Sequence, residues 1–258
     1  MAKLLSVLPK NYKEIADFLL EYEVWSSPAE YWLNEFQVWW DENSAFSEDM
    51  ERGWVLRDKQ KIVGFMGLIP SPFQIFGKEI VVFNATTWYV HPEYRSESLQ
   101  FLTKSINYAK DSICFNTTPS DRLIKILQKF DFLSIPRSTC KRSFIIIDFE
   151  KVLKVKFGQS ILNKFAIKII SPFLAIAQSI RLKKTNLEEI NRVKRIRKAD
   201  STFDGLWERT KHIFPTTNIR NAKTINWYCF NKNEYEKIVF GYYLNGQLLG
   251  YLILKDPR

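Results

Sequence analysis

The chain has 258 residues, of which 46% are hydrophobic and 26% are charged, and these are ordinary values for a globular protein. This composition excludes collagen, a disordered tail and a low-complexity array, and the length corresponds to one or two domains. The three cysteines form no CxxC pair and the two histidines are far apart in the sequence. We therefore expect a reducing compartment, no disulfide framework and no metal site.

The net charge of +10 is distributed unevenly along the chain. Residues 1–150 contain 17 basic and 20 acidic side chains, whereas residues 151–258 contain 21 basic and 8 acidic ones. Most of the excess lies in residues 151–198, where 13 basic side chains accompany only Glu188 and Glu189. This asymmetry indicates an anionic partner for the second part, such as a membrane surface, a nucleic acid or a phosphorylated substrate.

The sequence predicts neither a secretory signal nor a membrane-spanning helix. The apolar stretch at the N-terminus is short and ends at Pro9, and no small-residue cleavage site follows it. The longest apolar stretch, Ile161–Ile180, contains Lys164, Lys168 and Pro172. We therefore expect a cytoplasmic protein, located at the inner face of the membrane if the basic block binds lipid.

Residues 1–150 predict a mixed α/β (α+β) sheet. A strand at Leu4–Leu8 precedes a helix at Lys10–Glu23 and a second helix, for which Ser27 is the expected cap and Pro28 the first residue. Strands are expected next at 53–57 and 62–69, and Pro70 and Pro72 are expected to end the second of these. The elements expected after the prolines are strands at 73–76 and 79–90, a helix at 99–110, a strand at 112–115, a helix at 119–130 and a strand at 143–149. The bulky aromatic residues expected in the core or at a domain interface are Trp32, Phe36, Trp39 and Trp40. Antiparallel hairpins followed by a βαβ crossover are typical of such a sheet.

Residues 151–198 predict a basic, amphipathic helical linker with a break at Pro172. Three interpretations remain open for this segment. It is a helix packed between two domains, an interfacial helix on an anionic bilayer, or a nucleic-acid-binding segment. The third is the least favoured, because no known nucleic-acid motif accompanies the charge.

Residues 199–258 are expected to repeat the opening of residues 1–150. Two helices, Thr202–Lys211 and Ala222–Asn231, precede a hairpin that turns at Asn245-Gly246. This hairpin is similar to the one at residues 55–65, at a spacing of 186 residues. The sequence therefore predicts duplication of one fold. Because the second copy ends after its hairpin, it is a half-domain with an exposed edge strand or part of an incomplete chain.

The segment Trp88–Leu102 is the candidate phosphate-binding segment. A strand that runs into a helix N-terminus leaves backbone N–H groups directed outward, which suits a phosphate or diphosphate. Arg95 adds a positive charge directly before the helix.

The motif V-x-P-E-Y-R at Val90–Arg95 resembles the acyl-CoA-binding motif of the GNAT (Gcn5-related N-acetyltransferase) superfamily. The resemblance covers residues 1–150. The arrangement of residues 151–258 resembles the tandem GNAT-like acyltransferases often found among bacterial polysaccharide genes, with matching segments at Phe203–Trp207 and Ile219–Tyr228. Together the two resemblances imply three regions: a GNAT-like acyltransferase domain at 1–150, the linker at 151–198 and a partial second GNAT-like half at 199–258.

The resemblance also implies an acyl-CoA-dependent N-acyltransferase. Its co-substrate would be acetyl-CoA or another acyl-CoA, and its acceptor an amine, such as an amino sugar in surface-polysaccharide biosynthesis. The pantetheine arm would lie along Thr86–Val90, and the diphosphate would bind the amides of Ser96 to Gln100. The residues implied in acyl-CoA binding are Trp88, Tyr89, Val90, Arg95, Ser96, Glu97, Ser98, Leu99 and Gln100.

Two asparagines are the catalytic candidates. Asn84 lies on the central strand and Asn116 follows the next strand, and either amide could orient a water or polarise a carbonyl, although neither can act as a base. Ser98 and Gln100 stand where the family usually has small residues, and Leu127 stands where it often has a tyrosine. The alternative is therefore a GNAT-fold binding or scaffolding protein without catalytic activity. A homodimer is also left open.

Overall fold

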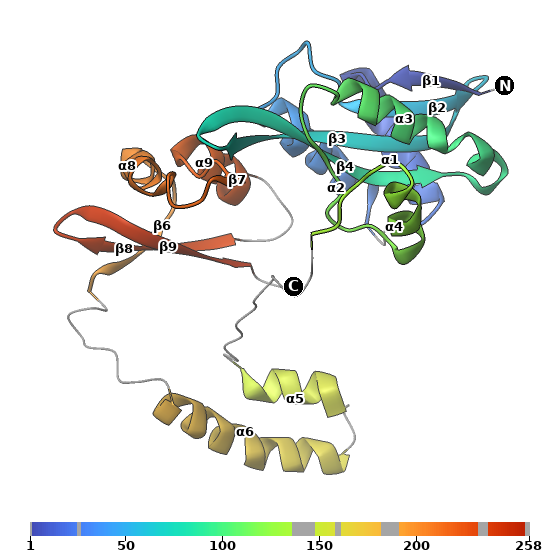
Figure 1. Cartoon of the computed structure of the whole chain (residues 1–258). Helices are drawn as coiled ribbons and strands as arrows, with labels where there is room; N and C mark the ends of the chain where they lie inside the picture. Colours follow the sequence, from blue (N-terminus) through green and yellow to red (C-terminus); the bar gives the residue numbers. More distant parts are fainter. Residues whose placement is uncertain are drawn as a thin grey trace. The chain divides into compact units, whose positions relative to one another are not determined.

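The computed structural model describes residues 2–24, 27–135, 148–157, 161–181, 191–231 and 237–255. Two compact units make up the chain, one formed by residues 1–119 with 192–258 and the other by residues 120–191 (Figure 1). The first unit therefore contains the start and the end of the sequence. The domain boundaries expected at residues 150 and 198 stay predictions.

The larger sheet of the first unit has the strand order β1-β2-β3-β4-β5, and β7 pairs with the end of β3. Its strands are β1 (Lys3–Ser6), β2 (Gly53–Asp58), β3 (Lys61–Ile75), β4 (Lys78–Val90), β5 (Cys114–Phe115) and β7 (Thr216–Asn218). All pairs are antiparallel except β4 with β5, which is parallel. The mixed sheet expected from the sequence is confirmed.

Helices cover both faces of this sheet. The helices are η1 (Pro9–Asn11), α1 (Tyr12–Glu21), α2 (Ala29–Phe36), η2 (Gln37–Asp41), η3 (Pro92–Glu97) and α3 (Leu99–Tyr108). Side chains of α1 and α2 pack with Val55 and Phe65, whereas Phe101 of α3 packs with Leu56 and Met66. Because successive strand residues point to opposite faces, these two clusters form separate cores above and below the sheet.

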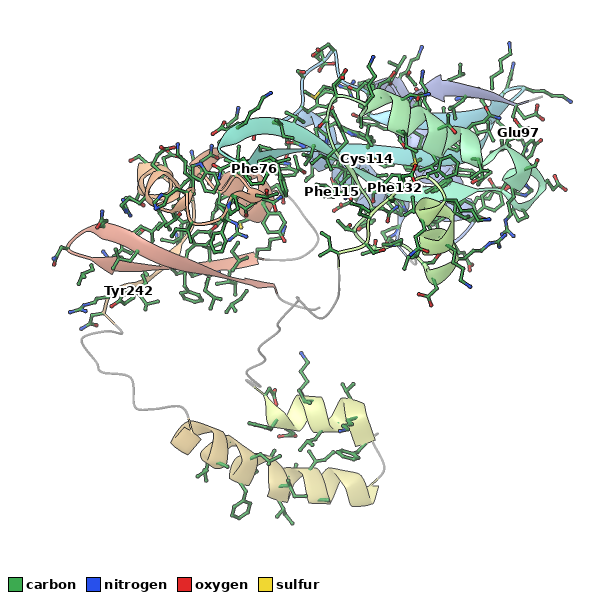
Figure 2. All side chains as sticks on the ribbon, viewed as in Figure 1. Phe76, Glu97, Cys114, Phe115, Phe132 and Tyr242 are labelled. Atoms are coloured by element: carbon green, nitrogen blue, oxygen red, sulfur yellow. The ribbon has the colours of Figure 1, made fainter. Side chains whose placement is uncertain are left out.

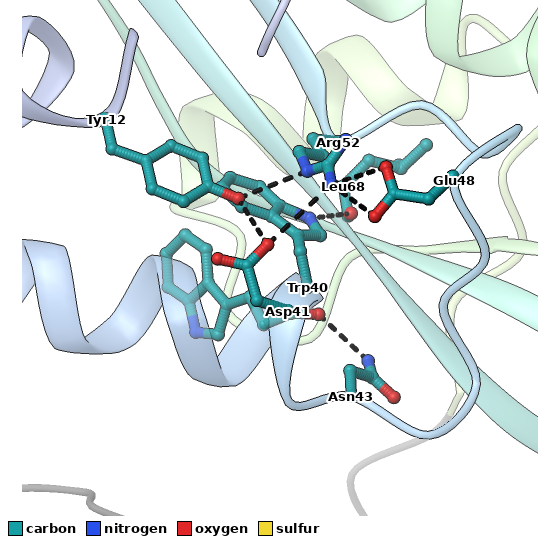
Figure 3. Close-up of polar contacts among 8 residues, drawn as sticks. Tyr12, Trp40, Asp41, Asn43, Glu48, Arg52 and Leu68 are labelled. Atoms are coloured by element: carbon teal, nitrogen blue, oxygen red, sulfur yellow. Dashed lines mark hydrogen bonds and ion pairs between the residues drawn. The ribbon is translucent and has the colours of Figure 1, made fainter. Parts of the chain in front are cut away.

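The aromatic set of α2 and η2 lies in the first core, as expected. Trp32, Phe36 and Trp40 are at most 2% exposed, and the Trp40 indole N–H donates to the Leu68 carbonyl at 2.8 Å. Next to Trp40, the Tyr12 hydroxyl donates to Asp41 at 2.9 Å and accepts from the Arg52 guanidinium at 3.1 Å (Figure 3). These contacts connect α1 and η2 to Arg52, the residue directly before β2.

The expected interruption by Pro70 and Pro72 is wrong, because β3 continues through both prolines. The Pro70 carbonyl accepts from the Asn43 side chain at 2.8 Å, and the Pro72 carbonyl accepts from the Ile219 amide at 3.1 Å. In a strand the nitrogen and carbonyl of one residue point to the same side, so both proline nitrogens lie on the side away from β4. Neither proline therefore removes a hydrogen bond from the β3–β4 ladder.

Two local expectations also need correction. Pro28 is the N-cap of α2 rather than its first residue, and no side chain caps this helix. The expected strand at 143–149 lies mostly outside the described residues, and Phe149 begins a helix.

The end of the sequence forms a second, smaller sheet within the first unit. Its strands, in the order β6-β8-β9, are β6 (Val193–Ile196), β8 (Lys237–Leu244) and β9 (Gln247–Lys255), and its helices are α8 (Ser201–Thr210) and α9 (Ala222–Phe230). The Asn245-Gly246 turn has positive φ at both residues, as expected for this hairpin.

This sheet repeats the β1-β2-β3 arrangement. The β2–β3 register shifts between Leu56 and Arg57, and the β8–β9 register shifts between Tyr242 and Tyr243, at the expected spacing of 186 residues. The pairs Leu56–Gly64 and Tyr242–Gly250 are equivalent. The repeat expected from the two hairpins is therefore present in the fold.

The second unit contains three described helices, α4 (Asp121–Gln128), α5 (Phe149–Phe157) and α6 (Ile161–Arg181). The Ser120 side chain caps α4 by accepting from the Leu123 amide at 3.3 Å. After α4, Asp131 has a φ of 61°, the left-handed conformation that glycine adopts most readily. Helix α6 continues through Pro172, where the sequence predicts a break.

Candidate acyl-CoA site

The β4–β5 pair ends in the middle of β4. Phe83 pairs with Cys114 and Asn84 pairs with Phe115, and β5 then ends. Among the described residues no strand pairs with the same side of Ala85–Val90, which we call the open β4 edge. In Figure 2, Cys114 and Phe115 lie at the start of this edge, and Glu97 lies in the loop beyond its end. Unpaired main-chain groups on such an edge can bind an extended ligand in the manner of an added strand.

A β-bulge distorts β4 within the open edge. Thr86 pairs with Gly67 and Tyr89 pairs with Phe65, so Thr87 and Trp88 together oppose Met66. Thr87 has a φ of 51°, which is rare for a β-branched residue and costs about 1–3 kcal/mol. The bulge changes the direction of the main-chain groups directly beyond Asn84, and bulges of this kind are common beside active sites.

Two polar side-chain atoms of β4 are buried and have no hydrogen-bond partner in the described structure. They are the Oδ1 atom of Asn84 and the indole Nε1 of Trp88. The first is an acceptor that precedes the bulge, and the second is a donor within the bulge. A buried polar group without a partner costs roughly 1–3 kcal/mol, so an arrangement that retains two on one strand is suited to a polar ligand.

The loop after β4 is held by polar contacts to the rest of the sheet. The His91 Nδ1 accepts from the Glu93 amide at 3.4 Å, and the Tyr94 hydroxyl donates to Asp58 at 2.8 Å. The hydrogen bond to Asp58 raises the pKa of Tyr94, so the phenol stays protonated. Glu93, through its main-chain amide, and Tyr94, through its hydroxyl, therefore help to hold the loop in place.

The residues expected to bind the diphosphate lie on η3 and the first turn of α3. The Ser98 amide already donates to the Arg95 carbonyl at 3.1 Å, and the Gln100 side chain donates to Glu97 at 3.2 Å. Arg95 is exposed, and the described residues include no ion-pair partner for it. Ser96 and Leu99 are also exposed. The loop is therefore exposed to solvent, and two of its side chains, Gln100 and Glu97, contact each other.

The side chains of the expected site residues on β4 do not all point the same way. The Tyr89 ring packs in the first core against Phe18 and Tyr22, with centroid distances of 5.8 and 5.9 Å. Val90 is buried in the second core beneath α3. The His91 amide donates to the Val63 carbonyl at 2.8 Å, so the main-chain groups of Val90, one residue earlier, face away from β3 and are available to a ligand, whereas those of Tyr89 face β3. The ligand-binding role of both residues stays a prediction.

Cys114 and Asn116 lie where β5 leaves β4. Burial raises the pKa of the Cys114 thiol to about 11, so the sulfur is a thiol at neutral pH rather than a thiolate nucleophile. Asn116 follows β5 directly and is half-buried. Asn84, Cys114 and Asn116 are thus the polar side chains nearest the point at which the strands separate.

A cavity lies between the two sheets of the first unit, and its volume is about 460 Å³. Its walls come from β3, α9 and β9, and they carry aromatic rings and one guanidinium: Ser71, Trp227, Tyr228, Tyr251 and Arg220 are among its lining residues. Burial raises the pKa of the Tyr251 hydroxyl, although Arg220 opposes this effect. Ser71 is two residues along β3 from Ile69, the partner of Asn84, so the cavity begins roughly 7 Å along the strand from that pair.

The described part of the chain contains no cluster of His, Cys, Asp and Glu that could hold a metal ion. None of the described helices is long and apolar enough to cross a bilayer.

Comparison with family models finds no match, and no curated protein matches the sequence. Among solved structures, the chain is similar to Saccharomyces cerevisiae N-myristoyltransferase with bound myristoyl-CoA, with a TM-score of 0.51 and 14% identity over 98% of this chain and 57% of that chain. It is also similar to a conserved Enterococcus faecalis protein of unknown function, described as a probable N-acyltransferase, with a TM-score of 0.58 and 11% identity over 98% of this chain and 55% of that chain.

The chain has a GNAT fold. It spans just over half the length of these two structures, and its sequence identity to them is low, so the likeness establishes the fold alone. The GNAT fold expected from Val90–Arg95 is confirmed, whereas the individual site residues stay predictions.

Sequence reasoning missed two features of this region. The bulge at Thr87 has no signal in the sequence, because a β-branched residue normally predicts regular strand. The cavity between the sheets depends on contacts between segments about 150 residues apart, which no local sequence pattern indicates.

Proposed function

We propose that this protein is an acyl-CoA-dependent N-acyltransferase. The observation that carries the proposal is the open β4 edge, where the sheet separates beside a bulge and leaves the Asn84 Oδ1 and Trp88 Nε1 atoms without partners. The GNAT fold and its similarity to a structure with bound myristoyl-CoA support the choice of ligand. The acyl chain length is not part of the proposal.

Acyl-CoA would lie along the open β4 edge. Its pantetheine amides would pair with the main chain of Thr86–Val90, and its phosphates would bind near Arg95 and the first turn of α3. The unpaired Asn84 and Trp88 atoms fit a ligand with both amide donors and carbonyl acceptors, which pantetheine has. When bound, acyl-CoA supplies the activated thioester.

The proposed reaction is direct transfer. The acceptor amine forms a C–N bond to the thioester carbonyl, the C–S bond breaks, and the amine proton leaves to solvent while the CoA sulfur takes up a proton. Asn84 and Asn116 would orient the carbonyl or a water, since an amide cannot act as a base. A covalent intermediate on Cys114 is disfavoured, because its thiol has a raised pKa of about 11.

For the acceptor we propose an amino sugar, bound in the cavity between the two sheets. Aromatic rings suit the apolar faces of a sugar, and Trp227, Tyr228 and Tyr251 line this cavity together with the cation of Arg220. A role in surface-polysaccharide biosynthesis, as in the tandem GNAT-like enzymes that the sequence resembles, is consistent with this acceptor.

A second candidate function is binding without catalysis. The contact between Gln100 and Glu97, and the use of the Ser98 amide inside the loop, favour this candidate, because they occupy groups that would otherwise face the diphosphate. In that case the protein would be a GNAT-fold scaffold.

Calorimetric titration with acetyl-CoA and with myristoyl-CoA, combined with release of the CoA thiol in the presence of glucosamine, tests both candidates. Transfer predicts binding and thiol release that needs the amine, with glucose as the control acceptor. Arg95→Ala should weaken binding several-fold by removing a phosphate-directed charge, whereas Lys104→Ala, an exposed cation on α3, should not. Binding without thiol release favours the scaffold, and absence of binding to either acyl-CoA overturns the enzymatic proposal.

A further inference from the structure

Helices α5 and α6 of the second unit form a hairpin (Figure 1). One face of α6 carries exposed apolar side chains. On α6, Ile167 and Ser171 are buried, with 4% and 9% exposure. Ile169, Phe173 and Ile176 are 61%, 68% and 57% exposed, and their spacing of four and three residues places them on one side of the helix. At 100° per residue, that side lies opposite Ile167 and Ser171.

The apolar face extends beyond these three residues. Ile170 on α6 is 48% exposed, and on α5 Val155 and Phe157 are 84% and 55% exposed. Soluble monomers rarely leave so many large aliphatic and aromatic side chains together in water, so a face of this kind marks a binding surface.

The charge of the hairpin identifies the partner. Helices α5 and α6 contain six Lys and Arg residues and one acidic residue, Glu150, which pairs with Lys154 at 2.5 Å. Two copies of this hairpin would repel each other if their faces met, which disfavours self-association through it. An apolar face combined with a predominantly basic set of charges is instead complementary to a surface that offers hydrocarbon beneath anionic groups.

We propose that the α5–α6 hairpin docks on an anionic lipid bilayer. Ile169, Phe173 and Ile176 would enter the boundary between headgroups and acyl chains, while the basic residues contact lipid phosphates. Helix α6 would lie in the plane of the surface, because Lys164, Lys168 and Pro172 interrupt its apolar sequence and no described helix could span the membrane. The proposal does not depend on the proposed acyltransferase function.

Flotation with phosphatidylcholine vesicles, with and without phosphatidylglycerol, tests this proposal on the full chain. We expect the chain to float with vesicles that contain phosphatidylglycerol, and rising salt should weaken its binding. The triple variant Ile169→Ser, Phe173→Ser, Ile176→Ser should lower partitioning by at least about tenfold, since each substitution removes inserted apolar surface. The variant Lys151→Glu, Lys156→Glu, Lys168→Glu should bind less and lose its salt dependence.

Phe214→Ser provides the matched control, because Phe214 is 60% exposed on the first unit and lies outside the hairpin. This variant should float like the parent, and circular dichroism should show parental helix content for every variant. Absence of flotation with phosphatidylglycerol, equal flotation with neutral vesicles, or unchanged flotation of the triple serine variant would each overturn the proposal. In the first case a protein surface would cover the apolar face.

Discussion

Asn84 on β4 and Phe115 on β5 form the last residue pair before the two parallel strands separate. The pair brings the amide of Asn84, whose Oδ1 atom has no described partner, to the start of the open β4 edge. The bulge at Thr87 follows three residues later. A strand pair that ends at this point therefore creates both the free main chain and the unpaired acceptor on which the proposed chemistry depends.

Asn84→Ala should separate activity from stability. If Asn84 orients the reacting carbonyl or a water, we expect kcat to fall by roughly 10- to 100-fold with little change in acyl-CoA affinity. The free energy of unfolding should stay within about 1 kcal/mol of the parent, since the substitution removes a buried acceptor that makes no hydrogen bond. Steady-state kinetics and urea unfolding measure the two quantities. A fall in kcat that is accompanied by an equivalent loss in the free energy of unfolding would indicate that Asn84 has a purely structural role.

Gln100→Gly should strengthen acyl-CoA binding. The Gln100 side chain now contacts Glu97 across the start of α3, and glycine would remove it and let a phosphate approach the main chain. We expect the dissociation constant for acetyl-CoA to fall several-fold in calorimetry, even though glycine in a helix costs about 1 kcal/mol of stability. Gln128→Gly, at the end of α4, is the control for that stability cost. An unchanged dissociation constant would show that Gln100 does not obstruct the site.

Gly64→Ala and Gly250→Ala make the same change at equivalent positions of the two halves. A Cβ atom on Gly64 would lie 3.1 Å from Val90 and 3.3 Å from Phe101, whereas nothing lies within 4 Å of a Cβ atom on Gly250. Gly64→Ala should therefore destabilise the protein by about 1–3 kcal/mol through overpacking. Gly250→Ala should leave stability unchanged or raise it by up to about 1 kcal/mol. Urea unfolding followed by circular dichroism distinguishes them, and equal effects would contradict the packing described around Gly64.

Tyr12→Phe should change the response of stability to alkaline pH. Burial, followed by the hydrogen bond to Asp41, raises the pKa of Tyr12 well above its ordinary value of 10.0. Above that ordinary value the unfolded chain loses the phenolic proton while the folded chain keeps it, so stability falls as pH rises. Without this phenol, the variant should lose less stability than the parent above about pH 10.

At neutral pH, the same variant should be less stable than the parent by about 1–2 kcal/mol, because the hydrogen bonds to Asp41 and from Arg52 disappear (Figure 3). Tyr228→Phe, whose side chain is half exposed, is the matched control. Parallel pH profiles for Tyr12→Phe and the parent would contradict the assigned pKa direction.

Most of the fold could be predicted from local sequence signals. The Asn245-Gly246 turn specified its hairpin, the apolar spacing in residues 12–21 specified α1, and Val90–Arg95 led to the GNAT fold. The repeat was also visible, since the register shifts at Leu56 and Tyr242 keep the spacing read from the two hairpins.

The features that could not be predicted depend on tertiary contacts. Pro70 and Pro72 predict a break in the strand because proline has no backbone N–H to donate to a neighbouring strand. The contacts of their carbonyls with Asn43 and Ile219 show that both proline nitrogens lie on the side of β3 away from β4, where the β3–β4 ladder needs no donor. Thr87 is strained in a way that its residue type disfavours, so the surrounding sheet must impose the conformation. The candidate site was thus predictable as a place on the chain, while its unpaired atoms were not.

Strand β3 runs unbroken for 15 residues and pairs with β2 near its start, with β4 along most of its length and with β7 at its end. One strand therefore belongs to both halves of the first unit, and the buried Gln74 side chain adds hydrogen bonds to the carbonyls of Lys211 and Phe214. Rotation of one half against the other would have to break this ladder. Opening of the site by a hinge between the halves is thereby disfavoured, and substrate entry must rely on smaller movements of loops such as the one from His91 to Ser98.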